Sequence, residues 1–520
     1  MSKTSLLQIL RRAYRIANLA NNLQIPPAEA VERHQQRISR RQLLHASMMA
    51  TGALTAVALH HQTSTATDRS IEPVLIIGAG IAGLTAGYYL HKAGIPIRII
   101  EASNRLGGRI RSQERAVGTE NTIELGGEFI DTGHQTIRKL ALELGLDLVD
   151  LATVDTGLKT EILWFDRREI DARTLITAFT PLAKQMAIDT KAIGEVTYKS
   201  ANAKARKLDR MSISAYLQKY CPDPLLRRWI EVAYTNEYGL PVQQQSAINL
   251  LLLMGKDSQK IEIFGSSDQR YQIRGGNHQI IDRLATKLAD FIETNTSLTS
   301  IRSTPNGRYR VNFQHREQIS ERVILALPFS VLRQIKLDVK LPTVKQQAIQ
   351  ELGYGNNTKV ITGYRDRLWR TKYGSDGQVF GDLDVLSETW ESGRYTTSQQ
   401  GVIVNFTGGE LGQKLAKTQP AIAGSRFVTD FQKVFAGVES GYLNKSMVTN
   451  WINSPYSRGA YACYLVGQWT KFAGVEGERV RNLFFVGEHC SLEAQGYMEG
   501  GCATGAAVAK TIIQELKVKS

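Results

Sequence analysis

The sequence predicts a protein of mixed α/β and α+β class, with a doubly wound α/β domain assembled from discontinuous segments and a second domain of mixed sheet and helices. The first observation behind this prediction is a strand-like apolar run at 74–77, followed by glycines and a helical pattern that ends near residue 92. The second is the return of the strand-turn-helix order near the end of the chain, from LFFVGEH to TIIQEL. The third is a succession of helical and strand-like segments between these two ends.

The elements between those ends follow from the periodicity of apolar residues. Helical patterns occur at 134–146, 207–235 and 275–290, and strand-like segments occur at 97–100, 307–314, 322–327, 358–364, 401–406 and 446–452. The strand at 74–77, the helix after it and the strand at 97–100 form a β-α-β unit, in which the two strands run parallel. The sequence contains no internal repeat and no low-complexity tract.

Composition restricts the classes of function. The chain has 520 residues and a formal net charge of +15, but eight basic residues fall within residues 1–41. The rest of the chain has no basic run interleaved with aromatic residues, so we expect no nucleic-acid partner. The cysteines form no CxxC pair, so we expect neither a structural zinc site nor a redox dithiol, and no metal. They are Cys221, Cys463, Cys490 and Cys502.

The first 66 residues have the features of a targeting segment. Ser39-Arg40-Arg41-Gln42-Leu43-Leu44 resembles a twin-arginine export signal, and it leads into an apolar run at 43–59 and small residues at 64–66. We therefore expect export of the folded protein to a periplasm, a thylakoid lumen or the exterior, with membrane contact only through this signal. The alternatives are an anchoring helix, a surface helix at 6–23 and a cytoplasmic protein.

Three glycines follow the first strand and open the helix after it. In this spacing Gly78 permits a tight turn, Gly80 allows the backbone to approach a pyrophosphate, and Gly83 lets the helix pack closely on the strand. Glu101 ends the second strand, where an acid binds the hydroxyls of a ribose. These features predict a Rossmann-like dinucleotide site, but they do not distinguish NAD from FAD.

The segment after Glu101 distinguishes the two dinucleotides. Arg105-Leu106-Gly107-Gly108-Arg109 resembles the RxGGR motif of the FAD-dependent amine oxidase family, which includes flavin monoamine oxidases and L-amino-acid oxidases. The resemblance covers most of 70–515 and implies bound FAD, with Arg109 helping to neutralise the pyrophosphate. It implies an FAD-binding domain from 70–130, 270–340 and 475–515, and a substrate-binding domain from 131–269 and 341–474.

The resemblance also implies further contacts to the cofactor. Residues 124–131 are similar to the family segment beside the isoalloxazine ring, 297–299 to the strand beside adenine, and 485–500 to the ending of monoamine oxidases. In the family these segments leave room for the flat ring, touch adenine, and bind the ribityl or pyrophosphate region. The implied cofactor residues here are Gly126, Gly127, Leu298, Trp451, Glu488 and Met498.

Three residues match catalytic positions of the family. Tyr461 and Tyr497 correspond to two aromatic rings that stand before the flavin and guide the amine between them, a role that suits electron-rich rings. Lys359 matches the lysine that holds a water at the flavin N5, which implies a role in oxygen reactivity or imine hydrolysis. Outside such motifs, the tyrosines would be read as core residues and the lysine as a surface group.

Two departures from the family pattern bear on the site. Ala460 occupies the position of the cysteine that attaches the flavin in mammalian monoamine oxidases, so we expect FAD to be non-covalent. Phe129 occupies the position of the arginine that grips the substrate carboxylate in L-amino-acid oxidases of the snake-venom type. A substrate carboxylate would then need another arginine, such as Arg365 or Arg458.

The expected function is oxidative deamination of a primary amine or L-amino acid to the imine and then the aldehyde or 2-oxo acid, with O₂ or another electron acceptor. Glu128 and Phe129 are the expected substrate contacts, and Glu128 or Asp131 could meet the second cation of a diamine or basic amino acid. The plainer reading of these acids is a helix cap or solvated groups. The rival functions are FAD-dependent desaturation of a polyene or porphyrinogen, and a non-catalytic flavoprotein. A homodimer is compatible with the sequence.

Overall fold

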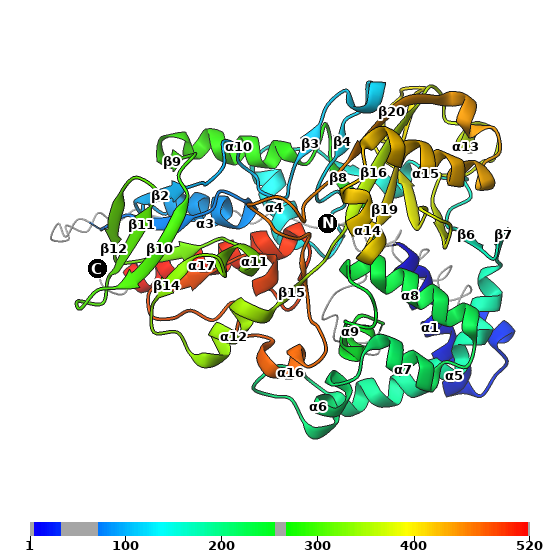
Figure 1. Cartoon of the computed structure of the whole chain (residues 1–520), viewed down its shortest axis with the longest axis horizontal. Helices are drawn as coiled ribbons and strands as arrows, with labels where there is room; N and C mark the ends of the chain where they lie inside the picture. Colours follow the sequence, from blue (N-terminus) through cyan, green and yellow to red (C-terminus); the bar gives the residue numbers. More distant parts are fainter. Residues whose placement is uncertain (1–4, 33–70, 255–266, 518–520) are drawn as a thin grey trace, which may run out of the picture.

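A computed structural model describes residues 5–32, 71–254 and 267–517 of the chain (Figure 1). Figure 1 shows a domain around α3 and α17, a second sheet around β16 and β19, and a group of helices that includes α5 and α8. The twin-arginine motif and the apolar run of the predicted signal fall outside these residues. Within the described ranges, no helix combines the length and apolarity needed to cross a membrane.

A five-stranded parallel sheet forms the centre of the first domain. Its order is β22-β13-β1-β2-β9, with bounds Leu483–Phe485, Val323–Leu325, Val74–Ile77, Ile97–Ile100 and Ile292–Glu293. All four pairings between neighbouring strands are parallel. Each residue of β1 is buried, as expected for a strand inside a parallel sheet that is covered on both faces. The strands come from the beginning, middle and end of the chain, which confirms the predicted fold class.

The helices of this domain pack on the sheet and on one another. Helix α3 (Ile81–Lys92) begins at the glycine loop, and α17 (Met498–Lys517) lies directly against it. The approach is close at Gly505, where an added Cβ would stand 2.3 Å from the Ala82 carbonyl oxygen. Helix α10 (His278–Leu288) also contacts α3.

Smaller sheets and short helices complete the connections. A four-stranded sheet has the order β12-β11-β10-β14, with bounds Glu317–Ser320, Tyr309–Phe313, Leu298–Ser303 and Lys336–Asp338. Two-stranded pairs are β3 with β4 (Ser112–Gln113, Ile123–Glu124), β5 with β8 (Leu148–Asp150, Tyr271–Ile273) and β15 with β21 (Gly353–Tyr354, Ala462–Cys463). The short helices are α4 (Gln135–Glu143), α11 (Phe329–Leu332), α12 (Thr343–Glu351), α13 (Leu368–Thr371), α14 (Gly409–Ala416) and α16 (Gln468–Phe472).

A seven-stranded, mostly antiparallel sheet forms the second domain. Its order is β20-β16-β19-β18-β17-β6-β7, with bounds Tyr442–Val448, Thr358–Tyr364, Gly401–Thr407, Glu388–Glu391, Val379–Gly381, Ile162–Phe165 and Arg168–Glu169. Helix α15 (Pro420–Val434) packs on one face, against β16 and β20. The strand predicted at 446–452 is wrong in its position, because β20 runs from residue 442 to 448 and the chain then turns away at 450–453.

The helical part of the second domain differs from the sequence-based expectation. Its helices are α1 (Ser5–Leu23), α5 (Ala172–Ile193), α6 (Ala203–Asp209), α7 (Ile213–Tyr220), α8 (Pro224–Tyr238) and α9 (Ala247–Met254). The single helix predicted at 207–235 is wrong, because two N-caps divide it. The Ser212 hydroxyl accepts from the amide of Ala215, and the Asp223 carboxylate accepts from the amide of Leu226 just before a favourable Pro at the helix start.

Helix α1 is part of this helical group. Its inward side consists of small and apolar residues at helical spacing, all at most 5% exposed: Ala13, Tyr14, Ile16, Ala17 and Ala20. The ring of Tyr14 lies 5.7 Å from that of Phe179 on α5, and the Asn21 amide donates to the Thr180 carbonyl at 3.1 Å. The first part of the predicted targeting segment therefore packs on the second domain.

The close contact between α17 and α3 leads to a first prediction. Replacing Gly505 with Ala should lower the free energy of unfolding by about 1–3 kcal/mol, because overpacking at a rigid backbone contact forces the helices apart. Thermal unfolding followed by circular dichroism would measure this. Gly133→Ala is the matched control, since a Cβ there meets no atom within 4 Å. Equal melting temperatures for the two variants would contradict the close contact.

Candidate active site

A cavity of about 380 Å³ lies along the edge where the strands of the parallel sheet end. Segments far apart in the sequence form its wall, including the glycine loop, the 105–110 turn, 454–458 and 486–489. The predicted site residues that line it are Gly78, Gly80, Glu101, Arg109, Gly127, Leu298, Trp451, Glu488, Tyr497 and Met498. The structure therefore brings most of the sequence-predicted cofactor residues to one cavity.

The glycine loop leaves open space at the start of α3. Gly78 has φ +103°, and an added Cβ would stand 2.7 Å from the Ala326 carbonyl oxygen, so only glycine fits this turn. At Gly80, by contrast, a Cβ would meet no atom within 4 Å, so free volume faces the N-terminus of the helix. The unpaired amides and the positive end of the helix dipole make this volume suitable for a phosphate. Gly83 packs on the Gly78 carbonyl instead and does not line the cavity.

Glu101 lies at the end of β2 and is held by backbone amides. Its carboxylate accepts from the amide of Ala79 at 2.8 Å and from the amide and hydroxyl of Ser103 at 2.9 and 2.8 Å. These bonds fix the carboxylate beside the glycine loop while it still lines the cavity. The position matches the acid that binds ribose hydroxyls in dinucleotide sites.

Arg109 and Glu488 form an ion pair in the cavity wall. The Arg109 guanidinium donates to Glu488 Oε1 at 3.0 Å and to the Ala460 carbonyl at 2.7 Å. Glu488 Oε2 accepts from the amide of Gly496 at 2.9 Å. Gly126 contributes by packing, since a Cβ there would stand 1.8 Å from the Arg109 carbonyl oxygen, and it does not line the cavity.

The donor set of this cavity fits FAD. A helix N-terminus with free volume and a guanidinium suit a pyrophosphate, and an acid at the end of β2 suits a ribose. Leu298 and Tyr497 extend the wall beyond these groups. The residues that would hold FAD are therefore the glycine loop, Glu101, Arg109 and Glu488. Once bound, the flavin supplies a two-electron acceptor, and the protein supplies position and polarity.

Tyr461 and Tyr497 lie in the same region of the fold. Both are buried, at 4% and 3% exposure. The Cα of Gly496, which precedes Tyr497, lies against the Tyr461 ring, since an added Cβ would be 3.4 Å from its Cδ2. The Tyr461 hydroxyl donates to the Glu237 carbonyl at 2.6 Å, and the Tyr497 ring meets His134 edge-on at 4.7 Å.

Lys359 lies on β16 and points into the protein. Its ammonium donates to the carbonyls of Glu124 and Gly126 at 2.8 and 3.0 Å and to Glu128 Oε2 at 2.8 Å. The Trp390 ring lies 5.3 Å from the same ammonium. Burial raises the pKa of the neighbouring Glu124 carboxyl to about 7. The Lys359 ammonium is thus bound to the 124–128 segment, which includes Gly127.

The acids expected to meet a substrate cation have partners within the protein. Glu128 is fully buried, pairs with Lys359 and also accepts from the Ser392 hydroxyl at 2.8 Å. Asp131 accepts from the Ser267 hydroxyl at 3.0 Å and lies 3.4 Å from His134. Phe129 packs edge-on against Trp390, with 5.7 Å between ring centres, and is 3% exposed.

Two buried acids that the sequence reading missed lie near Tyr461. Burial raises the pKa of Tyr461 well above its usual value, and the charges of Glu237 and Glu388 raise this pKa further. The phenol therefore stays neutral. Glu388 is 1% exposed and stands opposite Phe406 in the sheet, which in turn stands opposite Lys359. This register places the side chains of Glu388 and Lys359 on the same face of the sheet. Strand pairing was the missing signal for Glu388, and Glu237 lies near the end of helix α8, where no local motif marks it.

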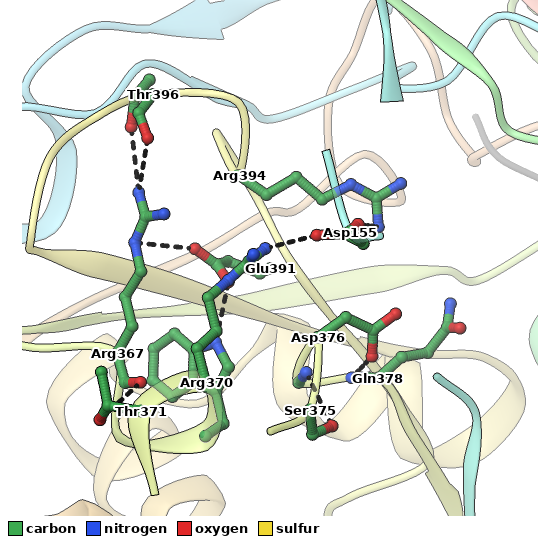
Figure 2. Close-up of polar contacts among 12 residues, drawn as sticks. Asp155, Arg367, Arg370, Thr371, Ser375, Asp376, Gln378, Glu391, Arg394 and Thr396 are labelled. Carbon is green, nitrogen blue, oxygen red and sulfur yellow. Dashed lines mark hydrogen bonds and ion pairs between the residues drawn. The ribbon is translucent and has the colours of Figure 1, made fainter. Parts of the chain in front are cut away.

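An ion network anchors the strand that carries Glu388. Figure 2 shows Arg367, Arg370 and Arg394 converging on Glu391 and Asp155. Arg367 and Arg370 lie 3.1 and 2.5 Å from Glu391, and Arg370 and Arg394 lie 2.7 and 3.1 Å from Asp155. The Arg394 guanidinium also lies 5.8 Å from the Phe129 ring centre. The network therefore fixes the end of β18 next to the 124–129 segment.

The arginines considered for a substrate carboxylate lie elsewhere. Arg365 is exposed at the end of β16, where its amide donates to the Gly441 carbonyl. Arg458 is exposed and lines the cavity on the side of the 454–457 turn.

A sequence profile of flavin-containing amine oxidoreductases matches residues 81–513 of the chain. The chain belongs to this family. The match confirms the predicted family and FAD as the cofactor, and it supports FAD-dependent amine oxidase activity on a small amine. We call this cavity the FAD site.

Curated relatives and solved structures agree with this assignment. The chain is 23% identical to flavin-containing amine oxidase A of Sus scrofa over 462 residues, which covers 85% of each chain. It is 23% identical over 470 residues to amine oxidase B of Homo sapiens, covering 85% of this chain and 86% of the relative. A putrescine oxidase bound to putrescine superposes with a TM-score of 0.73 at 21% identity, over 85% of this chain and 99% of that one. Cyclohexylamine oxidase from Brevibacterium oxydans gives the same TM-score and identity.

The position of Arg109 leads to a prediction for cofactor binding. Replacing Arg109 with Met should weaken FAD binding by about 10- to 100-fold, the effect of losing a charge-assisted hydrogen bond. Titration of the apoprotein with FAD, followed by quenching of flavin fluorescence, would give the dissociation constant. Arg111→Met is the control, because Arg111 is exposed and does not line the cavity. An unchanged dissociation constant in the Arg109 variant would exclude its role.

Proposed function

We propose that the protein carries out oxidative deamination of a primary amine or L-amino acid that bears a second positive charge, such as a diamine or a basic amino acid. In the overall reaction, R–CH₂–NH₂, O₂ and H₂O give R–CHO, NH₃ and H₂O₂, through an imine that water hydrolyses. An amino acid would give the 2-oxo acid in place of the aldehyde. The observation that carries the proposal is the pair of buried carboxylates, Glu237 and Glu388, beside Tyr461.

The environment of Tyr461 supports the part of this proposal that concerns binding of the amine group to be oxidised. Its hydroxyl is held by the Glu237 carbonyl, so the ring has a fixed orientation near the start of α17. The ring remains a neutral phenol, since burial raises its pKa well above the usual value. A neutral, electron-rich ring attracts an amine through its face. Tyr497, which lines the FAD site, would be the second ring.

The two acids support a second positive charge on the substrate. A carboxylate that is taken out of water is stabilised by a nearby cation. Glu237 is 0% exposed and Glu388 is 1% exposed, and both act electrostatically on Tyr461. A substrate whose first amine lies between the tyrosines could place a distal ammonium or guanidinium near these carboxylates. The solved putrescine oxidase with putrescine bound has the same fold.

The substrate class can be tested by anaerobic reduction of the bound flavin. Putrescine, L-arginine and L-lysine should bleach the flavin absorbance, while benzylamine and L-phenylalanine should do so much more slowly. Bleaching by the diamine alone would select amines over amino acids. Fast bleaching by benzylamine and L-phenylalanine, with none by the dications, would refute the proposal that the substrate bears a second positive charge. The proposal that the protein oxidises an amine would still stand.

Glu388 can be tested separately from the reaction itself. Glu388→Gln keeps the shape of the side chain but removes its charge, so kcat/KM for a dicationic substrate should fall by about 10- to 100-fold. The value for a monoamine should change little, which provides an internal control. Stopped-flow reduction and steady-state oxygen uptake would measure both. An equal loss for both substrate types would show that Glu388 does not read the distal charge.

We also propose that FAD is held without a covalent bond. Ala460 stands at the position expected for an attachment cysteine, and no cysteine among the described residues lines the FAD site. The nearby Cys463 is buried, and its sulfur lies 3.8 Å from both the Asn249 amide and the Tyr464 carbonyl. Acid precipitation should therefore release all yellow colour into the supernatant. Colour that stays in the pellet after washing would contradict the proposal.

A further inference from the structure

We propose that His134 is a positioning residue that fixes the orientation of the Tyr497 ring in the wall of the FAD site. This deepens the proposed function and rests on it, because that function places Tyr497 beside the amine. His134 lies directly before α4, far from Tyr497 in the chain, and the two residues meet only in the fold. Two sets of hydrogen bonds bring them together.

The first set holds the His134 imidazole at both of its nitrogens. The backbone amide of Asp131 donates to Nδ1 at 2.9 Å, and Nε2 lies 3.4 Å from the Asp131 carboxylate. A ring nitrogen that accepts a hydrogen bond carries no proton, so the imidazole is neutral and its proton is on Nε2, facing the carboxylate. The orientation of the imidazole is therefore fixed within the turn that precedes α4.

Asp131 is anchored in its turn by the chain that leads to β8. Its Oδ1 accepts from the Ser267 hydroxyl at 3.0 Å and from the backbone amide of Gln269 at 2.9 Å. Both Asp131 and His134 are buried. Breaking hydrogen bonds between buried groups costs free energy that water does not return, so the pair keeps this arrangement.

The second set of hydrogen bonds joins the start of α4 to the start of α17. The Glu499 carboxylate, in the first turn of α17, accepts from the backbone amides of Thr136 and Ile137 at 3.0 and 2.8 Å. These amides belong to the first turn of α4, where helix amides have no partner within the helix and a negative charge is favourable. Because Tyr497 directly precedes α17, these bonds hold the turn of His134 next to Tyr497.

The two rings then meet edge-on. Their centres are 4.7 Å apart and their planes are inclined by 66°. This arrangement places the positive rim of one ring against the negative face of the other, which is a favoured geometry for aromatic pairs. Tyr497 lines the FAD site, so a fixed neighbour restricts the tilt of a ring whose face would meet the amine. Loss of this alignment should slow the reaction step, since reactions depend steeply on the orientation of the reacting groups.

Three substitutions of His134 separate the effect of its ring from the effect of its hydrogen bonds. His134→Phe keeps an aromatic ring but has no nitrogen to accept from the Asp131 amide. His134→Asn keeps an acceptor near the place of Nδ1 and suits a residue that precedes a helix, but it removes the ring. His134→Ala removes both. A role limited to the shape of the turn would favour Asn over Phe, whereas positioning of Tyr497 by the ring favours Phe over Asn.

The first measurement is the limiting rate constant of flavin reduction by putrescine, followed anaerobically in a stopped-flow instrument. His134→Asn and His134→Ala should lower it by about three- to tenfold, which matches the free energy of a single aromatic contact. His134→Phe should stay within about twofold of the wild type, and the FAD dissociation constant should change by less than about threefold in all three variants. A wild-type rate in His134→Asn with a loss in His134→Phe would overturn the proposal. Equal losses in all three variants, or no loss in any, would also overturn it.

A double-mutant cycle tests whether His134 acts through Tyr497. Tyr497→Leu removes the ring that His134 is proposed to position, so His134→Ala should cause no further loss of rate in that background. An equal loss in both backgrounds would show that His134 acts by another route and would overturn the proposal.

Visible circular dichroism of the bound, oxidised flavin gives a readout that needs no amine. The flavin is planar, so its signal arises from asymmetric surroundings and should change with the tilt of an aromatic ring in the wall of the site. The spectra of His134→Asn and His134→Ala should depart from wild type in the same way, and that of His134→Phe should match it. Identical spectra in all four proteins would overturn the proposal. If no amine reduced the wild-type flavin, the proposed function would fail, while the spectra would still decide the role of His134.

Discussion

The site depends on one constraint, the complete burial of β1 between parallel strands on both sides. The amides and carbonyls of Val74–Ile77 must be satisfied by neighbouring strands, since water does not reach them. Those neighbours are β2, 20 residues later in the chain, and β13, which begins at Val323. Parallel pairing brings their carboxyl ends to one edge, where the glycine loop, Glu101 and the 326–328 turn meet.

Local spacing explains why much of this edge could be predicted. The turn at Gly78, the approach at Gly80 and the acid at Glu101 follow from neighbouring residues in the sequence, and all three line the FAD site. Arg109 and Glu488 lie in motifs that can be identified from their resemblance to the family. Their ion pair nevertheless joins residues far apart in the chain. The roles of these residues toward FAD remain predictions, but their gathering at one cavity is a property of the fold.

Long-range pairing explains why other features could not be predicted. Whether Glu388 faces Lys359 depends on the registers of β16 with β19 and of β19 with β18, and a shift of one residue would turn the acid to the other face. The three hydrogen-bond acceptors of the Lys359 ammonium lie more than 230 residues away in the chain, so no local pattern marks them. The prediction of a single helix at 207–235 was wrong for a different reason. The caps at Ser212 and Asp223 interrupt an apolar periodicity that continues across them.

Because α1 packs on the second domain, proteolytic cleavage after α1 and dissociation of α1 would be two separate events. Helix α1 precedes Arg40 and Arg41 in sequence, yet its buried side contacts α5, α8 and α9 of the second domain. Proteolysis near residue 66 would break the chain without breaking these contacts. Losing the helix would further require Tyr14 to leave Phe179 and apolar side chains to become exposed to water. A processed enzyme built this way would consist of two polypeptides, a large chain and a short helical peptide held without a covalent link, by packing and by the hydrogen bond from Asn21 to Thr180.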